Sequence, residues 1–302
     1  MNSPFLDLQG QSIPQDHVIG SGGSALILLQ NDVAVKTPLR YLWSSDLDVR
    51  RNHQSLQHEQ AVYRRLQSIP DKRSDGIVRC IETTSDTTKL TYMVNGDLRT
   101  YLSHSRVSHQ TQLAWFRDLA RTLSFIHERR ILVADIASRN FLLDSQLSIK
   151  FCDFSEASLL PLDSDMSLVD DNGFTTQIDI GLLAAVMYEV ITGTTCEVDL
   201  FKDDARYDGR AYWPERKTFP ATDDIWLGNI IERCWDGTFR SADSLLQALD
   251  SPCLPSSILD RALSLFHCHT KRYGAITITG TLGLVALALF GKTVFSKLWI
   301  SR

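Results

Sequence analysis

The hydrophobic pattern of this chain changes its period at Asn95-Gly96, and that change limits the folds available to it. Before this point, short apolar stretches have the alternation and length typical of β-strands, at 25–29, 33–35, 77–81 and 89–93. A single helical pattern, over 56–66, lies among them. After this point, apolar residues repeat about every 3.6 positions, as on the buried face of a helix, over 113–126 and 180–191. We therefore expect an α+β protein with a small β-rich lobe, a larger helical lobe and a cleft between them.

The composition is that of an ordinary globular protein. Hydrophobic residues make up 43% of the 302 residues and charged residues 22%, so the chain can bury a sizeable core. The formal net charge of -5 gives no reason to expect a nucleic-acid partner. The six cysteines form no Cys-x-x-Cys pair, which favours reduced thiols over a disulfide framework or a zinc site. The start of the chain lacks the pattern of a secretory signal.

Residues 273–291 form a largely apolar stretch without a charged side chain. As a helix rising about 1.5 Å per residue, this stretch would nearly cross the roughly 30 Å of hydrocarbon in a bilayer. We expect a transmembrane helix here, although a buried helix or a strand also fits these residues. Basic residues flank the stretch on both sides, so charge does not set its orientation. Its position predicts a single-pass tail anchor with the folded body in the cytosol, and without the anchor we expect a cytoplasmic protein.

These patterns divide the chain into a folded body and a membrane-associated end. The body is expected to consist of the two lobes, preceded by a short segment. The complete division is an N-terminal segment over 1–17, a small lobe over 18–94, a large lobe over 95–251, a linker over 252–272, a membrane span over 273–291 and a basic tail over 292–302.

Two acidic residues and an amide have the spacing of a phosphoryl-transfer site. Asp135 and Asn140 are separated by four residues, and Asp153 ends a hydrophobic strand further on. In such a site one carboxylate accepts or orients the proton of an incoming hydroxyl. An amide and a second carboxylate hold the Mg²⁺ that neutralises a triphosphate. The spacing alone is weak support, and the motifs that precede it strengthen the interpretation.

A glycine-rich turn and a strand lysine come earlier in the chain. Residues 20–23 read Gly-Ser-Gly-Gly, and glycines let backbone amides approach phosphate oxygens without a clash from Cβ. Lys36 ends the next strand, and Glu59 lies on the following helix at a suitable position to pair with it. Each feature by itself is more often structural than functional. Their combination in this order favours a nucleotide site.

With these motifs in this order, the chain resembles the eukaryotic protein kinase superfamily from roughly residue 18 to 250. It is also similar in character to short kinase-like proteins of fungi. The helix that Asp179 opens resembles the central helix of the family's large lobe, and the stretch from Ile230 to Trp235 resembles a late helix. The resemblance implies a bilobal kinase-like fold, with the apolar helix at the C-terminus added to it. It also implies ATP and Mg²⁺ as cofactors and a protein as substrate.

The resemblance also implies a role for each candidate residue. ATP would contact the glycine turn, the β-strand before the lysine and the hinge, through Gly20, Ser21, Gly22, Gly23, Ala34, Lys36, Tyr92, Met93 and Val94. Asn140 and Asp153 would hold Mg²⁺, and Glu59 would hold Lys36 in place. Asp135 would receive the hydroxyl proton. Arg139, as in the similar loop of tyrosine kinases, would place a cation at the transferring phosphate. Asp179 would hold the backbone of the catalytic loop from beneath.

Four departures from the family pattern qualify this resemblance. Val133-Ala134 replaces the usual His-Arg; Val133 is expected to fill the space of the histidine. Ala134 cannot bind a phosphorylated activation segment, so an active protein would need no phosphorylation there. Ser155 replaces the glycine after Asp153-Phe154, and the activation segment, residues 153–179, is short. Arg240 lacks its expected glutamate partner.

We therefore predict an ATP- and Mg²⁺-dependent protein kinase that acts on a protein hydroxyl and is tethered to a membrane. Retention of Lys36, Glu59, Asp135, Asn140 and Asp153 supports activity. The alternative is a pseudokinase, which binds nucleotide or partners without catalysis. A small-molecule phosphotransferase of related fold ranks last. The sequence does not decide between serine, threonine and tyrosine as the acceptor.

Overall fold

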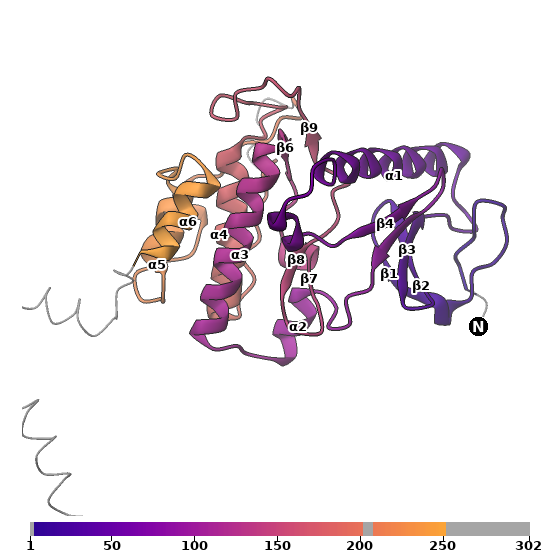
Figure 1. Ribbon diagram of the computed structural model, residues 1–302, viewed down its shortest axis with the longest axis horizontal. Coiled ribbons are helices and arrows are strands. Elements are labelled where there is room, and N and C mark those ends of the chain that lie inside the picture. Colours follow the sequence, from indigo (N-terminus) through magenta and orange to yellow (C-terminus); the bar gives the residue numbers. More distant parts are fainter. Residues whose placement is uncertain (1–2, 202–207, 252–302) are drawn as a thin grey trace, which may run out of the picture. The chain divides into compact units, whose positions relative to one another are not determined.

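The computed structural model describes residues 3–201 and 208–251 (Figure 1). The predicted linker, membrane span and basic tail, over 252–302, lie outside these residues. Among the helices that the structure does describe, none is both long enough and apolar enough to cross a bilayer.

The small lobe is built on a five-stranded antiparallel sheet in the order β1-β2-β3-β5-β4. The strands are β1 (Val18–Ser21), β2 (Ala25–Gln30), β3 (Val33–Pro38), β4 (Cys80–Thr83) and β5 (Thr88–Thr91). Helix α1 (Asp46–Leu66) runs beside the sheet (Figure 1). Its start is fixed by a capping box, in which Ser45 and Asp48 satisfy each other's backbone amides. The predicted strand-rich lobe with one helix is confirmed.

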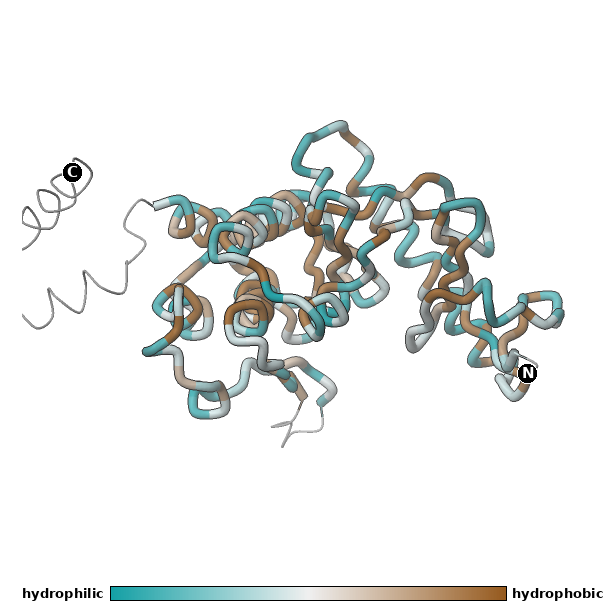
Figure 2. Tube along the Cα trace, turned by 90° about the horizontal axis from the view of Figure 1, so that it is seen from below, coloured by the Kyte–Doolittle hydropathy of each residue, from teal (hydrophilic) through white to brown (hydrophobic). Residues whose placement is uncertain are grey.

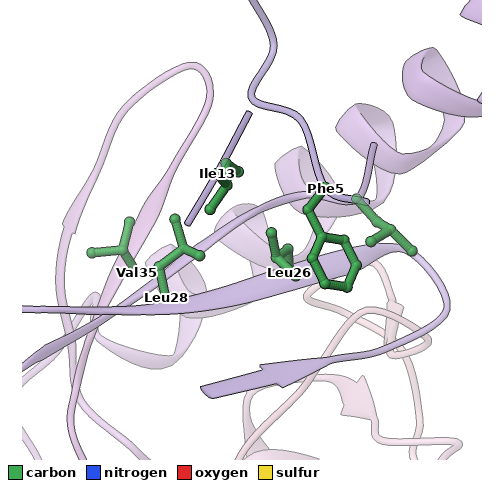
Figure 3. Packing of buried hydrophobic residues seen from close by; sticks show 6 residues of the cluster. Phe5, Ile13, Leu26, Leu28 and Val35 are labelled. Atoms are coloured by element: carbon green, nitrogen blue, oxygen red, sulfur yellow. The ribbon is translucent and has the colours of Figure 1, made fainter. Parts of the chain in front are cut away.

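The N-terminal segment adds side chains to the core of this lobe. Phe5 and Ile13 pack against Leu26, Leu28 and Val35 of the sheet (Figure 3). All five are less than a tenth exposed. The short helix η1 (Gln15–His17) then leads into β1. Burial of large apolar side chains is the main stabilising term in folding, so this segment stabilises the sheet that it covers.

The large lobe is helical, as predicted. Its helices are α2 (Leu98–His104), α3 (His109–Glu128), α4 (Thr176–Thr192), α5 (Gly228–Trp235) and α6 (Ala242–Asp250), with the short turn η4 (Arg216–Thr218) before α5. The short turn η2 (Lys72–Gly76) lies earlier in the chain, between α1 and β4. Helix α4 is buried on nearly all sides and packs against α3 and α5. Figure 2 shows hydrophobic residues concentrated along the inner helices and strands, with hydrophilic residues on the outer loops. Helix α4 therefore forms part of the buried core of this lobe.

Two small antiparallel ribbons lie between the sheet and the large-lobe helices. One pairs β6 (Ile131–Leu132) with β9 (Ser158–Leu159), and the other pairs β7 (Phe141–Leu143) with β8 (Ile149–Phe151). The loop between β6 and β7 carries Asp135 and contains the turn η3 (Ser138–Asn140). Asp153 lies two residues after the end of β8. The ribbons thus bring the catalytic loop and the start of the activation segment to the same place.

An aromatic stack lies within the large lobe. Trp213, Phe219 and Trp235 stack in sequence, with ring centroids 5.2 Å and 4.7 Å apart. Both indoles also donate hydrogen bonds, Trp213 to the carbonyl of Trp235 and Trp235 to the carbonyl of Gly181. Aromatic packing and these hydrogen bonds therefore join α4 to α5.

Arg240 is exposed, and no ion pair to it occurs in the described part of the chain.

Candidate active site

Three charged side chains from distant parts of the sequence meet in the structure. The ammonium group of Lys36, on β3, lies 2.8 Å from Glu59 Oε2, on α1. It also lies 2.9 Å from Oδ1 of Asp153, which comes just after β8. Glu59 is fully buried, and the Lys36 side chain is only 5% exposed. The structure therefore forms the predicted pair of Lys36 and Glu59 and adds Asp153 to it.

This arrangement shifts the pKa values of Lys36 and Asp153. Burial by itself would lower the pKa of Lys36, but the carboxylates of Glu59 and Asp153 outweigh it and raise that pKa above its ordinary value. Burial would raise the pKa of Asp153, whereas the Lys36 ammonium and hydrogen bonds lower it overall. Lys36 is therefore a permanent cation at neutral pH, and Asp153 is a carboxylate able to bind a metal ion.

The residues after Asp153 are held by α1. Glu59 Oε1 accepts a hydrogen bond from the Phe154 amide at 3.1 Å. The buried Phe154 ring packs edge-on against Tyr63, with centroids 5.4 Å apart. Asp153 itself has a left-handed backbone, with φ of 59°, whereas Ser155 does not. Serine in place of the family glycine is thus compatible with this turn.

Asp135 lies in the catalytic loop with two hydrogen-bonding neighbours. Its Oδ1 accepts a bond from Arg139 Nη2 at 2.6 Å, and its Oδ2 accepts one from Asn140 Nδ2 at 2.8 Å. The Asp135 side chain is 36% exposed and the Arg139 side chain 50%. Asn140 is linked to the strand before Asp153 because its carbonyl accepts a bond from the Cys152 amide at 3.0 Å. These hydrogen bonds connect Asp135 and Asn140 to Cys152, the residue before Asp153.

Asp179 holds the catalytic loop from beneath, as predicted. Its carboxylate accepts bonds from the amides of Val133 and Ala134, each at 2.9 Å. A third partner, His127 Nε2, lies 2.9 Å away on α3. Ala134 has a left-handed backbone, with φ of 65°, which is unusual for a residue with a side chain. The buried Val133 side chain fills its place in the core.

At each of the three glycines of the turn, the protein leaves enough space for a Cβ atom. A Cβ atom added at Gly20 would have its nearest contact at 3.7 Å, one at Gly22 at 4.0 Å, and one at Gly23 would meet nothing within 4 Å. None of the three has a positive φ. Neither packing nor a positive φ therefore requires glycine here, and the turn leaves its backbone open to close approach.

The hinge connects the sheet to α2. Met93 is buried and Val94 is exposed, with Tyr92 between these extremes. The Gly96 amide closes the turn by donating to the Met93 carbonyl at 3.1 Å. Ala34, a buried residue of β3, lies opposite Leu90 of β5, the strand that leads into the hinge. The predicted nucleotide-contacting residues thus lie on β1, in the turn after it, on β3 and in the hinge.

A protein kinase domain model matches residues 16–196, which is more than half of the chain. The chain belongs to the protein kinase family. Its small and large lobes are those of the kinase fold, and the ribbons between them carry the catalytic loop and the activation segment. Of the large-lobe helices, the match includes α2 to α4 and ends before α5 and α6.

Several curated kinases are similar to this chain. The Arabidopsis thaliana serine/threonine/tyrosine-protein kinase HT1 is 24% identical over 48% of this chain and 40% of its own length. The Danio rerio tyrosine-protein kinase receptor TYRO3 is 29% identical over 53% of this chain and 21% of its own. A Dictyostelium discoideum RGS domain-containing serine/threonine-protein kinase A is 22% identical over 75% of this chain and 20% of its own. The chain thus spans less than half the length of each.

The kinase site fits a magnesium nucleotide. The glycine turn offers an open approach to backbone amides, and Lys36 offers a permanent cation. In the part of the chain that the structure describes, no group of three or more His, Cys, Asp and Glu side chains could hold a metal ion. Mg²⁺ usually shares few protein ligands with phosphate oxygens and water, and Asn140 and Asp153 carry side-chain oxygens of the kind that it binds.

Sequence reasoning missed three residues that support this kinase site: His127, His58 and Arg65. His127 bonds to Asp179, while His58 and Arg65 reach the activation segment from α1. His127 carries the one available signal, because it is a polar residue on the apolar face of α3. The other two bond to backbone carbonyls, which leave no trace in the residue types.

Proposed function

We propose that this kinase domain is catalytically active and transfers the γ-phosphate of ATP to a hydroxyl group of a protein substrate. The observation that carries the proposal is the formed ion pair of Lys36 and Glu59 at 2.8 Å, with Asp153 joined to it. An assembled pair of this kind is required in active kinases. Lys36 and Asp153 therefore need no rearrangement of α1 before nucleotide binds.

The remaining residues have chemically consistent roles. Bound ATP and Mg²⁺ supply the phosphoryl group and the charge that neutralises it. The Asp135 carboxylate is the group that would orient the acceptor hydroxyl and receive its proton. Asn140 fixes Asp135 by donating to its carboxylate and to its carbonyl. Arg139, half exposed beside Asp135, brings a cation to the position where phosphate charge develops.

A pseudokinase is the second candidate. Ala134, Ser155 and the short activation segment favour it, because active relatives usually have other residues there. Against it, the turn accommodates Ser155 without a positive φ, and Asp179 fixes the backbone at Ala134. Both departures leave the positions of the charged residues intact, which supports the active enzyme.

Transfer of labelled γ-phosphate by the full-length protein tests the proposal. With Mg²⁺ and a panel of proteins and peptides, we expect transfer by the native protein and its loss in Asp135→Asn. Asp32→Asn, in the exposed β2–β3 turn, is the matched control and should transfer normally. Transfer that persists in Asp135→Asn would contradict the role of Asp135. Binding of Mg-ATP without any transfer by the native protein would favour the pseudokinase.

We also propose that residues 273–291 tether the protein to a membrane, with the kinase domain in the cytosol. The support is the uncharged stretch and its basic flanks. Fractionation of cells that express the full chain or residues 1–270 tests this. Recovery of the full chain with membranes and of the shortened chain in the soluble fraction is expected. A soluble full chain would contradict the tether.

A further inference from the structure

Two side chains of α1 bond to the backbone of the activation segment. His58 Nε2 lies 2.6 Å from the carbonyl oxygen of Ala157. Arg65 Nη1 donates to the carbonyl oxygen of Leu160 at 2.5 Å. His58 and Arg65 are seven residues apart, about two helical turns, so they project from one face of α1. That face of α1 therefore contacts the first eight residues of the activation segment, 153–160, at two positions.

The two carbonyls lie where the segment is itself well packed. Ala157 and Leu160 are 3% and 8% exposed. They flank β9, which pairs with β6, and the Leu160 amide donates to the Arg130 carbonyl at 2.9 Å. Arg65 Nη1 also lies 3.4 Å from that carbonyl of Arg130. Arg65 thus bridges the activation segment and the strand that precedes the catalytic loop.

These bonds involve carbonyl oxygens and need no phosphate group. Family members that are activated by phosphorylation use an arginine before the catalytic aspartate, and this chain has Ala134 at that position. Arg65 directs its cation to Leu160 and Arg130, although carboxylates such as Glu156 and Asp163 occur in the same segment. A guanidinium bound to carbonyls is a charge-assisted contact, stronger than a neutral hydrogen bond.

We propose that His58 and Arg65 are positioning residues that hold the activation segment in its active conformation without phosphorylation. This inference rests on the proposed kinase activity. His58 precedes Glu59, so the position of α1 that places Glu59 against Lys36 also places His58 against Ala157. A displacement of α1 would therefore break the ion pair and release the segment together.

In this contact the Nε2 atom of His58 carries the hydrogen, because the carbonyl oxygen of Ala157 can only accept a hydrogen bond.

Hydrogen exchange of the full-length protein, treated with phosphatase, tests the proposal independently of activity. The readout is the exchange rate of backbone amides within 154–160. Arg65→Met and His58→Leu should each accelerate this exchange about tenfold, the effect of losing one strong hydrogen bond. Arg64→Met, the exposed neighbour on α1, is the matched control and should leave the rate unchanged. Arg65→Lys and His58→Gln keep a donor and should restore part of the protection.

Kinetics give a second readout. With the native protein active, Arg65→Met should lower kcat for the protein substrate at least tenfold and change KM for ATP little, since Lys36 and the glycine turn remain. Exchange rates equal to those of Arg64→Met would overturn the proposal. So would loss of protection in the native protein on phosphatase treatment. If the native protein transfers no phosphate, the proposed activity fails, while the exchange rates still decide whether these residues hold the segment.

Discussion

The carboxylate of Asp179 accepts hydrogen bonds from the amides of two consecutive residues, Val133 and Ala134, each at 2.9 Å. It therefore holds Ala134 in a left-handed conformation with φ of 65°. Such a conformation costs on the order of 1 kcal/mol or more and persists only where the surroundings enforce it. Because Asp135 is the next residue, its direction depends on a buried group of α4.

Asp179→Asn should be among the most damaging single substitutions. One carboxamide oxygen would replace two carboxylate oxygens that serve three partners, and its NH₂ group would face donors. We expect the free energy of unfolding to fall by about 3 kcal/mol, as when a buried charged network loses a member. Urea denaturation measures this. Asp118→Asn, which removes an exposed contact to Arg121, should cost under about 1 kcal/mol, and equal costs for both variants would contradict this account.

Lys36→Met should destabilise the protein because it leaves the fully buried Glu59 without its cation. We expect a loss of about 3–5 kcal/mol in unfolding free energy. Glu59→Gln in addition should restore part of this loss, since it removes the unpaired charge. Lys89→Met, which removes an exposed pair with Glu82, is the control and should cost under about 1 kcal/mol. A double variant less stable than Lys36→Met would contradict this coupling.

Two glycine substitutions should have opposite consequences. Gly22→Ala, in the open turn, should leave the melting temperature unchanged and weaken ATP binding. Gly181→Ala should lower the unfolding free energy by about 1–3 kcal/mol, because the new Cβ would overlap the Trp213 ring. Thermal unfolding with and without Mg-ATP separates the two effects. A large loss of stability in Gly22→Ala would show that the fold itself needs this glycine.

Stability should decline at both ends of the pH range through Asp153 and Lys36. The lowered pKa of Asp153 contributes stability that is complete above its ordinary value of 3.8 and is lost as the pH falls further. The raised pKa of Lys36 contributes stability that is complete below its ordinary value of 10.5 and is lost at higher pH. Melting temperatures of the native protein and Asp153→Asn measure the acid effect. Parallel acid curves for the two proteins would contradict it.

The sequence predicted the charged part of the site and the division into two lobes because chemistry restricts residue type and order there. The positions of Lys36, Glu59 and Asp153 follow from that order. The roles of His58 and Arg65 do not, because their acceptors are main-chain carbonyls, which every residue has. The aromatic stack around Trp213 and Trp235 was equally hidden, since aromatic residues in a helical lobe are ordinarily core.

The packing of Phe5 and Ile13 on the sheet has a practical meaning for anyone who trims this protein to its recognisable kinase portion. A fragment that begins at residue 16, where the family match starts, would leave Leu26, Leu28 and Val35 facing water. Contiguous apolar surface of this kind promotes aggregation. Poor solubility of such a fragment would then reflect a missing cover, and its inactivity would say nothing about the catalytic residues.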